Sequence, residues 1–488
     1  MKISNRLNKN NNTSIIFHSS IVASQSFHRH TYVDLQPSNG NIIKLIAAFL
    51  NLTFIAGIVL FSLSSCSISK QISKQAAQLL LKDSIINTGH IGISIYEPAT
   101  NKYWYNHEAT KFYVPASNVK LFSLYAGLKY LGDSLIGVRY QQKENTLIIY
   151  PTGDPTFLHP DFKHQPIFDF LKSKANIHYC TQYFTKALGQ GWAWDDYTEN
   201  YMVQRSEFPI YGNLARVYNN EGTLTIVPKN IPLHTQTGFE KYKGHVEFSF
   251  FRKWDSNEII STVISPRPQK YEYEIPLATN NNEIVEFLSD TLHQDINLIS
   301  NKIEDSINNN DKKLHIIYSQ PTDSLFIPMM YHSDNFFAEQ TLLMASNEHL
   351  GYMSDEAMID TLLKTDLKDI PQKPNWVDGS GLSRYNLFSP QSFIYLLNKM
   401  KNEFGIKRLK IILPTGGTGT FKNYYQKDSG FIYAKTGSLS NHIAISGYLY
   451  TKKGKFIIFS ILTNQFQGSA TKVRRAEETF LETIREKY

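Results

Sequence analysis

Apolar residues recur at intervals of three and four positions between residues 114 and 131, in the stretch VPASNVKLFSLYAGLKYL. The positions that share this spacing are Leu121, Leu124, Tyr125, Leu128 and Leu131. The pattern predicts a helix with one buried face. Ser117 and Lys120 fall in its first turns, three positions apart, so their side chains can meet.

Runs typical of strands occur at both ends of the chain. GHIGISIYE and NKYWYNH predict a β-hairpin, and a short helix around residues 79 to 81 precedes them. GFIYAKTG, HIAISGYLY and KFIIFSILTN predict three further strands. A last helix follows, with an apolar side formed by Val473, Ala476, Phe480, Leu481 and Ile484. These elements can share one antiparallel sheet with helices packed on it, which is an α+β fold.

The region between these ends has a different pattern. Short runs such as GTLTIVP, GHVEFSFF and YEYEIPL alternate with Gly, Pro and Asn, which predicts a mainly β inserted domain over residues 160–310. The main domain then comprises residues 67–159 and 311–488, and residues 1–66 form a leader.

The leader has the pattern of an export signal. Residues 45 to 63 carry no charge, are mostly apolar and follow Lys44. The stretch ends in Leu63-Ser64-Ser65-Cys66, which resembles a bacterial lipobox and predicts a lipid on Cys66. An uncleaved membrane anchor or a plain signal peptide are the alternatives. In each case the protein is exported, and we expect a periplasmic, membrane-anchored lipoprotein.

Composition narrows the classes of partner. The 488 residues are 42% hydrophobic and 13% aromatic, as expected of a folded protein with two or three compact units. A surplus of 7 positive charges without an Arg/Lys stripe argues against nucleic acid. Two cysteines cannot form a disulfide framework or a four-thiolate metal site, and no metal or cofactor is expected. The oligomeric state stays open.

The chain contains three S-x-x-K matches, of which one has a suitable setting. Ser67-Lys70 follows the lipobox, and Ser469-Lys472 opens the last helix. Only Ser117-Lys120 begins a strongly apolar helix, where burial would lower the pKa of the lysine and let a neutral amine accept the serine proton. The alternative is a helix N-terminus with solvated polar residues.

Two later motifs favour the catalytic interpretation of Ser117 and Lys120. Ser333-Asp334-Asn335 precedes a helix-like run, and Lys435-Thr436-Gly437-Ser438 ends a strand-like run. Separately they could be a helix N-cap and a strand end with a turn glycine. S-x-x-K, S-D-N and K-T-G in this order are the signature of serine penicillin-recognising enzymes.

The chain therefore resembles the class C low-molecular-mass penicillin-binding proteins, the D-alanyl-D-alanine carboxypeptidase/endopeptidase family, over nearly all of its exported part. Further similar stretches are Gly153-Asp154-Pro155-Thr156, Asp378-Gly379-Ser380-Gly381-Leu382-Ser383-Arg384 and Leu413-Pro414 with Gly416-Gly417-Thr418-Gly419-Thr420. If the family resemblance is not used, these Gly-rich stretches are interpreted as turns. The resemblance implies a β-lactamase-like transpeptidase domain, acting on peptidoglycan peptides and reacting with β-lactams.

The resemblance also implies residue roles. Ser117 would be the nucleophile, Lys120 its base and Ser333 the proton donor to the leaving amine. Asn335 would bind the substrate amide, in a site completed by the K-T-G strand. In that strand, Lys435 and Thr436, which precede Gly437, would bind the terminal carboxylate. The backbone N–H groups of Ser117 and Ser438 would form the oxyanion hole.

Two other functions remain as alternatives. A serine β-lactamase would share this chemistry, although the large insertion and the D-G-S-G-L-S-R stretch disfavour it. A wall-binding protein could keep the fold without turnover. The absence of a G-x-S-x-G motif counts against an α/β-hydrolase. Asp334 is interpreted as an exposed helix-start carboxylate, and His107, His332 and His442 as structural residues.

Overall fold

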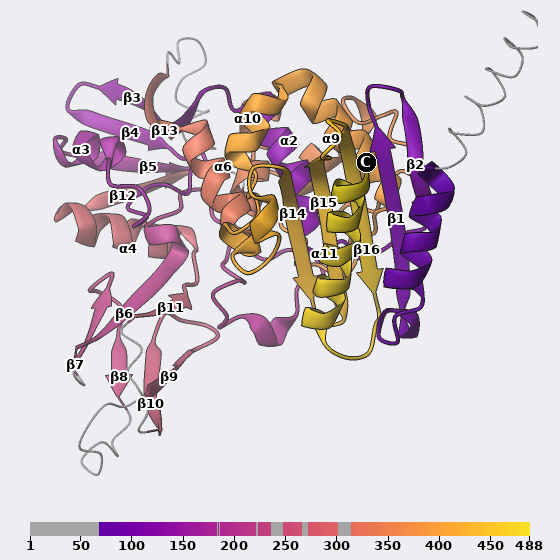
Figure 1. Ribbon diagram of the computed structural model, residues 1–488. Helices are drawn as coiled ribbons and strands as arrows, with labels where there is room; N and C mark the ends of the chain where they lie inside the picture. Colours follow the sequence, from indigo (N-terminus) through magenta and orange to yellow (C-terminus); the bar gives the residue numbers. More distant parts are fainter. Residues whose placement is uncertain are drawn as a thin grey trace, which may run out of the picture. The chain divides into compact units, whose positions relative to one another are not determined.

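The computed structural model describes residues 68–182, 184, 186–220, 223–235, 247–265, 272–300 and 314–488 (Figure 1). They belong to one compact unit, Ser65–Tyr488. The leader, including Cys66 and its predicted lipidation, lies outside the described residues. Among the helices of the described part, none combines the length and the apolar character needed to cross a bilayer.

The main sheet joins the two ends of the described chain, as predicted. Its order is β14-β15-β16-β1-β2, and every neighbouring pair is antiparallel (Figure 1). The strands are β1 (His90–Glu97), β2 (Lys102–His107), β14 (Ile432–Leu439), β15 (His442–Tyr450) and β16 (Phe456–Asn464). Because β14 is an edge strand, one of its sides remains open for a site.

Alternating side chains of the main sheet enter two separate cores. On β15, Ile443 and Ile445 pack in a core that also contains residues of α11 (Ala470–Lys487). Ala444 and Tyr448 pack in the other core, which includes α2. Burial on both faces explains why these strands are continuous apolar runs.

Helix α7 (Asn335–Leu350) begins and ends at residues with suitable capping properties. Asp334 caps α7 by accepting a hydrogen bond from the Phe337 N–H at 2.8 Å, and α7 ends at Gly351 with φ +81°. Residues 68–76 are helical, as predicted, and continue into a π-helical turn, Ala77–Leu81. The other helices are α2 (Lys120–Tyr130), α3 (Pro166–Lys172), α4 (Asn281–Leu292), α6 (Thr322–Tyr331), α7 (Asn335–Leu350), α8 (Asp355–Lys364), α9 (Pro390–Phe404), α10 (Ile406–Ile412) and α11.

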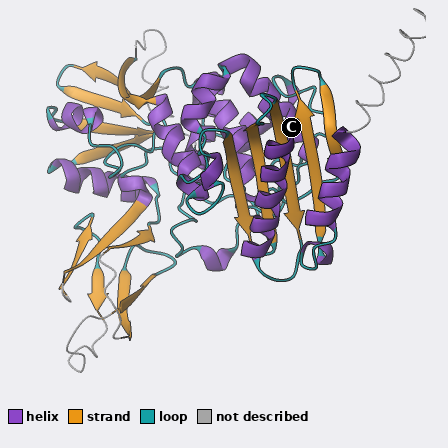
Figure 2. Cartoon of the chain, in the orientation of Figure 1, coloured by secondary structure: helices purple, strands orange, loops and turns teal. Residues whose placement is uncertain are grey.

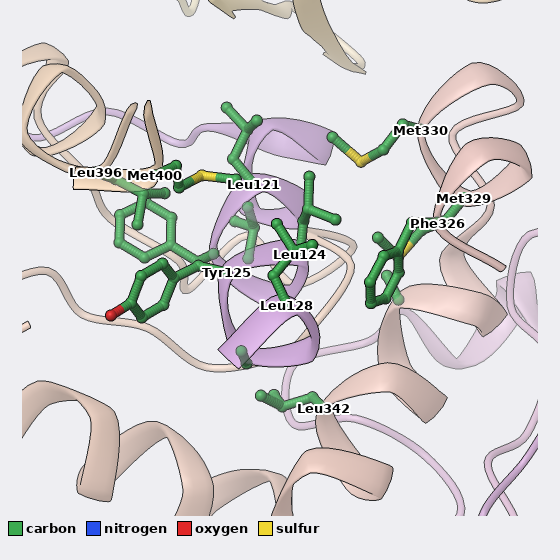
Figure 3. Packing of buried hydrophobic residues seen from close by; sticks show 14 of the residues in the cluster. Leu121, Leu124, Tyr125, Leu128, Phe326, Met329, Met330, Leu342, Leu396 and Met400 are labelled. Carbon is green, nitrogen blue, oxygen red and sulfur yellow. The ribbon is translucent and has the colours of Figure 1, made fainter. Parts of the chain in front are cut away.

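Helix α2 is buried on every side, so the predicted single buried face was wrong. All residues from Lys120 to Leu128 are buried. The neighbouring side chains come from α6, α7 and α9 (Figure 3). They include Phe326, Met329, Leu342, Leu396 and Met400. The polar residues at the start of α2 therefore lie at the end of an apolar core.

The remaining strands form three sheets (Figure 2). A mixed sheet has the order β12-β5-β4-β3-β13, and β5 runs parallel to both β4 and β12. Two three-stranded sheets have the orders β8-β10-β9 and β11-β6-β7. The strands are β3 (Ser134–Lys143), β4 (Thr146–Tyr150), β5 (Ile177–Thr181), β6 (Leu214–Asn220), β7 (Thr223–Val227), β8 (Leu233–Thr235), β9 (Glu247–Arg252), β10 (Ile259–Ser265), β11 (Glu272–Pro276), β12 (Ile296–Ser300) and β13 (His315–Pro321).

The mixed sheet takes strands from within residues 160–310 and from the sequence on both sides of this interval. β5 and β12 lie within it, whereas β3, β4 and β13 lie outside it. The exact domain boundaries therefore remain a prediction. Buried Cys180 belongs to β5.

Candidate active site

A tight turn places the first motif. Ala116–Val119 form a 3₁₀ turn that leads directly into α2, and Ala116 has φ +47°. Ser117 lies in this turn, and Lys120 is the first residue of α2. The Nζ atom of Lys120 lies 2.9 Å from the Oγ atom of Ser117. The structure thus brings the two predicted residues into hydrogen-bond contact.

The Lys120 amine has two further acceptors. It donates to the Oδ1 atom of Asn335 at 2.6 Å and to the backbone carbonyl of Ser380 at 2.9 Å. Asn335 belongs to the second motif, and Ser380 to the D-G-S-G-L-S-R stretch. Three segments that are distant in sequence therefore hold one amine beside the Ser117 hydroxyl.

Burial decides the charge of this amine. Lys120 has no solvent exposure, and this desolvation lowers its pKa to about 8. The negative charges of Asp334, Asp378 and Glu339 oppose the effect without cancelling it. A neutral amine is accordingly accessible near neutral pH, which a general base requires.

The second motif connects the site to the inserted region. Ser333 has φ +58° and lies between α6 and α7. Asn335 donates through Nδ2 to the backbone carbonyl of Tyr201 at 2.8 Å. Asp334 lies at the start of α7, as interpreted from sequence, and it is the N-cap of this helix, a role that the sequence analysis had considered for Ser333. Asp334 is only partly exposed, and burial raises its pKa. Its description as an exposed carboxylate was wrong because the surrounding segments cover it.

The third motif lies on the edge strand β14. Lys435 is fully buried and donates to the Oγ atom of Ser333 at 2.8 Å and to the carbonyl of Thr436 at 2.6 Å. Burial, and then the charge of Lys120, hold its pKa well below the usual range. A Cβ atom on Gly437 would lie 3.0 Å from the Ser117 nitrogen. The glycine therefore lets β14 approach the nucleophile turn.

These motifs border a cavity of about 330 Å³. The predicted residues in its wall are Ser117, Ser333, Thr436, Gly437 and Ser438. Residues missed by the sequence analysis also line it, and these include Thr420, Phe421, Tyr424, Arg474 and Glu477. Thr420 lies in a stretch that sequence reasoning singled out as similar to the family, whereas nothing in the sequence marked Arg474 or Glu477.

The D-G-S-G-L-S-R stretch is an ordered loop and supports the nucleophile. The Asp378 carboxylate accepts hydrogen bonds from the N–H groups of Gly381 at 2.8 Å and Ser383 at 2.7 Å, and from Trp192 Nε1 at 3.0 Å. Gly381 has φ +84°, and a Cβ atom there would lie 1.9 Å from the Ala116 carbonyl oxygen. The loop is thereby fixed against the turn that carries Ser117.

A buried ion cluster lies behind this loop. Arg205 donates to Asp355 at 2.5 Å and to Glu339 at 3.3 Å, and it is 1% exposed. The other Glu339 oxygen accepts the Ser380 N–H at 2.7 Å. Burial and the charge of Asp378 raise the pKa of Glu339 to about 7. The cluster links Arg205 to the residue whose carbonyl binds Lys120.

The titratable residues of the described part include no group of His, Cys, Asp and Glu arranged to hold a metal ion. Of the three histidines near the motifs, His442 lies with Nδ1 2.7 Å from the carbonyl of Ser440, and His332 is exposed.

Comparison with known proteins identifies the family. The model of the D-Ala-D-Ala carboxypeptidase 3 (S13) family matches residues 72–484. The chain belongs to this family. It is accordingly a serine-type D-Ala-D-Ala carboxypeptidase, a hydrolase, as the sequence predicted.

Individual relatives agree with this assignment. A D-alanyl-D-alanine carboxypeptidase of Actinomadura sp. is 22% identical over 448 residues, which cover 80% of each chain. Carboxypeptidase DacB of Mycolicibacterium smegmatis is 29% identical over 161 residues, or 30% of this chain and 35% of the relative. The crystal structure of penicillin-binding protein 4 from Haemophilus influenzae superposes with a TM-score of 0.67 at 17% identity, covering 85% of this chain and 99% of that one. The predicted penicillin-recognising fold is confirmed.

Proposed function

We propose that this protein hydrolyses peptidoglycan stem peptides and cross-links through an acyl-Ser117 intermediate, and that penicillin acylates the same residue. The observation that carries the proposal is the 2.9 Å contact between the Ser117 hydroxyl and the buried Lys120 amine. The relatives' names, which include a D-alanyl-D-alanine carboxypeptidase, support the substrate class.

Acylation begins with proton transfer from Ser117 to Lys120. With a pKa of about 8, about a tenth of the lysine is neutral at pH 7. The hydroxyl attacks the peptide carbonyl as its proton moves to the amine. Asn335 and the Ser380 carbonyl hold the amine in place, so that the two reacting atoms stay aligned.

The oxyanion is stabilised by the backbone N–H groups of Ser117 and Ser438. Each such donor contributes roughly 3 kcal/mol in other acyl-transfer enzymes. The close approach of Gly437 to the Ser117 nitrogen supports this pairing, because it brings β14 beside the nucleophile. The donors are backbone groups and are therefore oriented before substrate binds.

The leaving amine receives its proton through Ser333. The Ser333 hydroxyl accepts a hydrogen bond from Lys435, which leaves its own proton free to be donated. Asn335 Nδ2 has a second hydrogen besides the one given to Tyr201, and this hydrogen binds the substrate amide. Lys435 and Thr436 bind the terminal carboxylate, and water then hydrolyses the acyl ester.

We also propose that the protein is exported to the periplasm and anchored by a lipid on Cys66. The apolar stretch before Leu63-Ser64-Ser65-Cys66 supports this. Metabolic labelling with a palmitate analogue should mark the wild-type chain and not Cys66→Ala. Labelling of both proteins alike would contradict lipidation at this residue.

Fluorescent penicillin tests the catalytic proposal. We expect a stable covalent adduct on the wild type that is lost in Ser117→Ala, with Ser67→Ala as control because Ser67 begins another S-x-x-K match. Defined muropeptides then measure release of D-alanine and cleavage of cross-links. Rapid turnover of the penicillin would instead indicate a β-lactamase, and absence of both adduct and turnover would indicate a wall-binding protein.

A further inference from the structure

Arg474 lies in the wall of the cavity that contains Ser117. It belongs to the first turns of α11, close to the N-cap Ser469. Its guanidinium donates to the Oγ atom of Ser438 at 2.8 Å. A residue 357 positions after the nucleophile in sequence thus contacts the side chain that directly follows the K-T-G motif.

The charge of Arg474 partly opposes the rise that burial causes in the pKa of the nearby Glu477, but no ion pair among the described residues compensates this charge. Among the ion pairs of the described residues, none includes Arg474, whereas the adjacent Arg475 pairs with Glu478 at 2.5 Å. Glu477 lines the same cavity, but it is buried and accepts a hydrogen bond from the Thr463 hydroxyl at 2.8 Å. Burial raises the pKa of Glu477 to about 8, so its neutral form predominates at pH 7.

Arg474 is also the single basic side chain among the described residues that line this cavity. Lys435 does not line it and is fully buried. Burial holds the pKa of Lys435 far below its usual range, while a guanidinium stays charged at every relevant pH. The permanent positive charge that faces the cavity therefore belongs to α11.

The surroundings of Arg474 suit a small carboxylate ligand. The hydroxyls of Thr436 and Ser438 occur on alternate residues of β14 and line the cavity beside it. Phe421 and Tyr424 add an aromatic wall. A planar guanidinium recognises a carboxylate through two parallel N–H donors, and the apolar wall strengthens this contact by excluding water.

We infer that Arg474 is a specificity-determining residue that binds the C-terminal carboxylate of the departing D-alanine, together with the hydroxyls of Thr436 and Ser438. This inference rests on the proposed function, since it names the contact that selects substrates with a free C-terminal carboxylate. The Ser438 hydroxyl accepts a hydrogen bond from one guanidinium donor and keeps the Arg474 side chain in position.

Two substrates with the same acyl half test the inference. One is an acyl-D-Ala-D-Ala peptide, and the other is the acyl-D-alanine thioester of an uncharged thiol, which lacks the carboxylate. We expect Arg474→Ala to lower kcat/KM for the peptide about 10- to 100-fold and to leave the thioester within about twofold. Arg474→Lys should retain part of the activity that Arg474→Ala loses, because lysine keeps the positive charge but lacks the two parallel N–H donors of the guanidinium.

Lys472→Ala is the matched control, because Lys472 is an exposed cation in the same first turns of α11 and does not line the cavity. It should leave both substrates unchanged. Equal losses on peptide and thioester in Arg474→Ala, or an unchanged peptide rate, would overturn the inference. A wild-type protein that cleaves neither substrate would instead contradict the proposed function, which keeps the two failures distinguishable.

Discussion

Lys120 and Lys435 are both fully buried and close enough to interact electrostatically, and each amine contacts the hydroxyl of a different serine. Lys120 lies 2.9 Å from the Ser117 oxygen, and Lys435 lies 2.8 Å from the Ser333 oxygen. Neither lysine takes part in an ion pair among those of the described residues, and the charge of Lys120 lowers the pKa of Lys435 further. Burying two amines in this way opposes folding. For Lys120, burial also makes the neutral amine accessible for proton transfer, a trade of stability for function.

The acylation rate should follow the protonation of Lys120. Because the charged amine cannot accept the Ser117 proton, we expect the rate to rise about tenfold per pH unit below pH 8 and to level off above it. The measurement is the second-order rate constant for a fluorescent penicillin between pH 5.5 and about 9.5. A flat profile would contradict the assignment of Lys120 as base.

Replacing Asp334 by the uncharged residue asparagine checks the same assignment. Asp334 is the largest of the charges that raise the pKa of Lys120, and asparagine keeps its capacity to cap α7. In Asp334→Asn the midpoint of the pH profile should therefore move to lower pH, with the maximal rate retained. A midpoint that stays in place or moves to higher pH would show that another group titrates.

Lys435→Ala should impair substrates with a terminal carboxylate more than a neutral thioester. Its amine holds Ser333, so both substrates lose some rate. Only the substrate with a carboxylate also loses the electrostatic attraction of this amine, which lies behind the cavity wall against the Thr436 carbonyl. We expect an excess loss of about tenfold or more in kcat/KM for the peptide. Equal losses on the two substrates would restrict Lys435 to positioning Ser333.

The sequence predicted the three motifs, the main sheet and the last helix because each depends on local patterns. Residue spacing marks a serine and a lysine on one turn, and apolar runs mark buried strands. The full burial of α2 could not be derived in this way, because a distant segment covers the face that the spacing left open. Phe122 packs against Trp376 and Phe388, and the Ser123 hydroxyl donates to the Gly379 carbonyl.

Other parts of the site have no signature in sequence. The carbonyl of Ser380 binds Lys120 through a backbone atom that every residue possesses. Arg474 reaches the cavity only because α11 packs beside β14 and β15, which places Arg474 near a nucleophile that lies 357 positions earlier in sequence. The link from Asn335 to Tyr201 likewise depends on how the inserted region docks.

Arg205→Met should destabilise the protein strongly. The substitution leaves Glu339 and Asp355 without their buried cation, and breaking such a cluster typically costs about 3 to 5 kcal/mol. Lys186→Ala is the matched control, because its pair with Glu356 connects the same two regions at the surface and contributes at most about 1 kcal/mol. Urea unfolding followed by fluorescence measures both. Similar midpoints for the two variants would contradict a stabilising role for the buried cluster.

Gly381→Ala should abolish acylation by displacing the turn that carries Ser117. The new methyl group would lie 1.9 Å from the Ala116 carbonyl oxygen, so either the loop or the turn must move. A shift of about 1 Å in a reacting group reduces rates about 100-fold.

Alanine at position 381 would also adopt an unfavourable backbone conformation at φ +84°, and the control must reproduce the free-energy cost of that conformation. Gly454→Ala does so, because Gly454 has φ +78° with no atom near the added Cβ. Gly454→Ala should lose about 1 kcal/mol of stability and keep the wild-type rate of penicillin labelling. A wild-type rate of labelling in Gly381→Ala would show that the loop does not position the nucleophile.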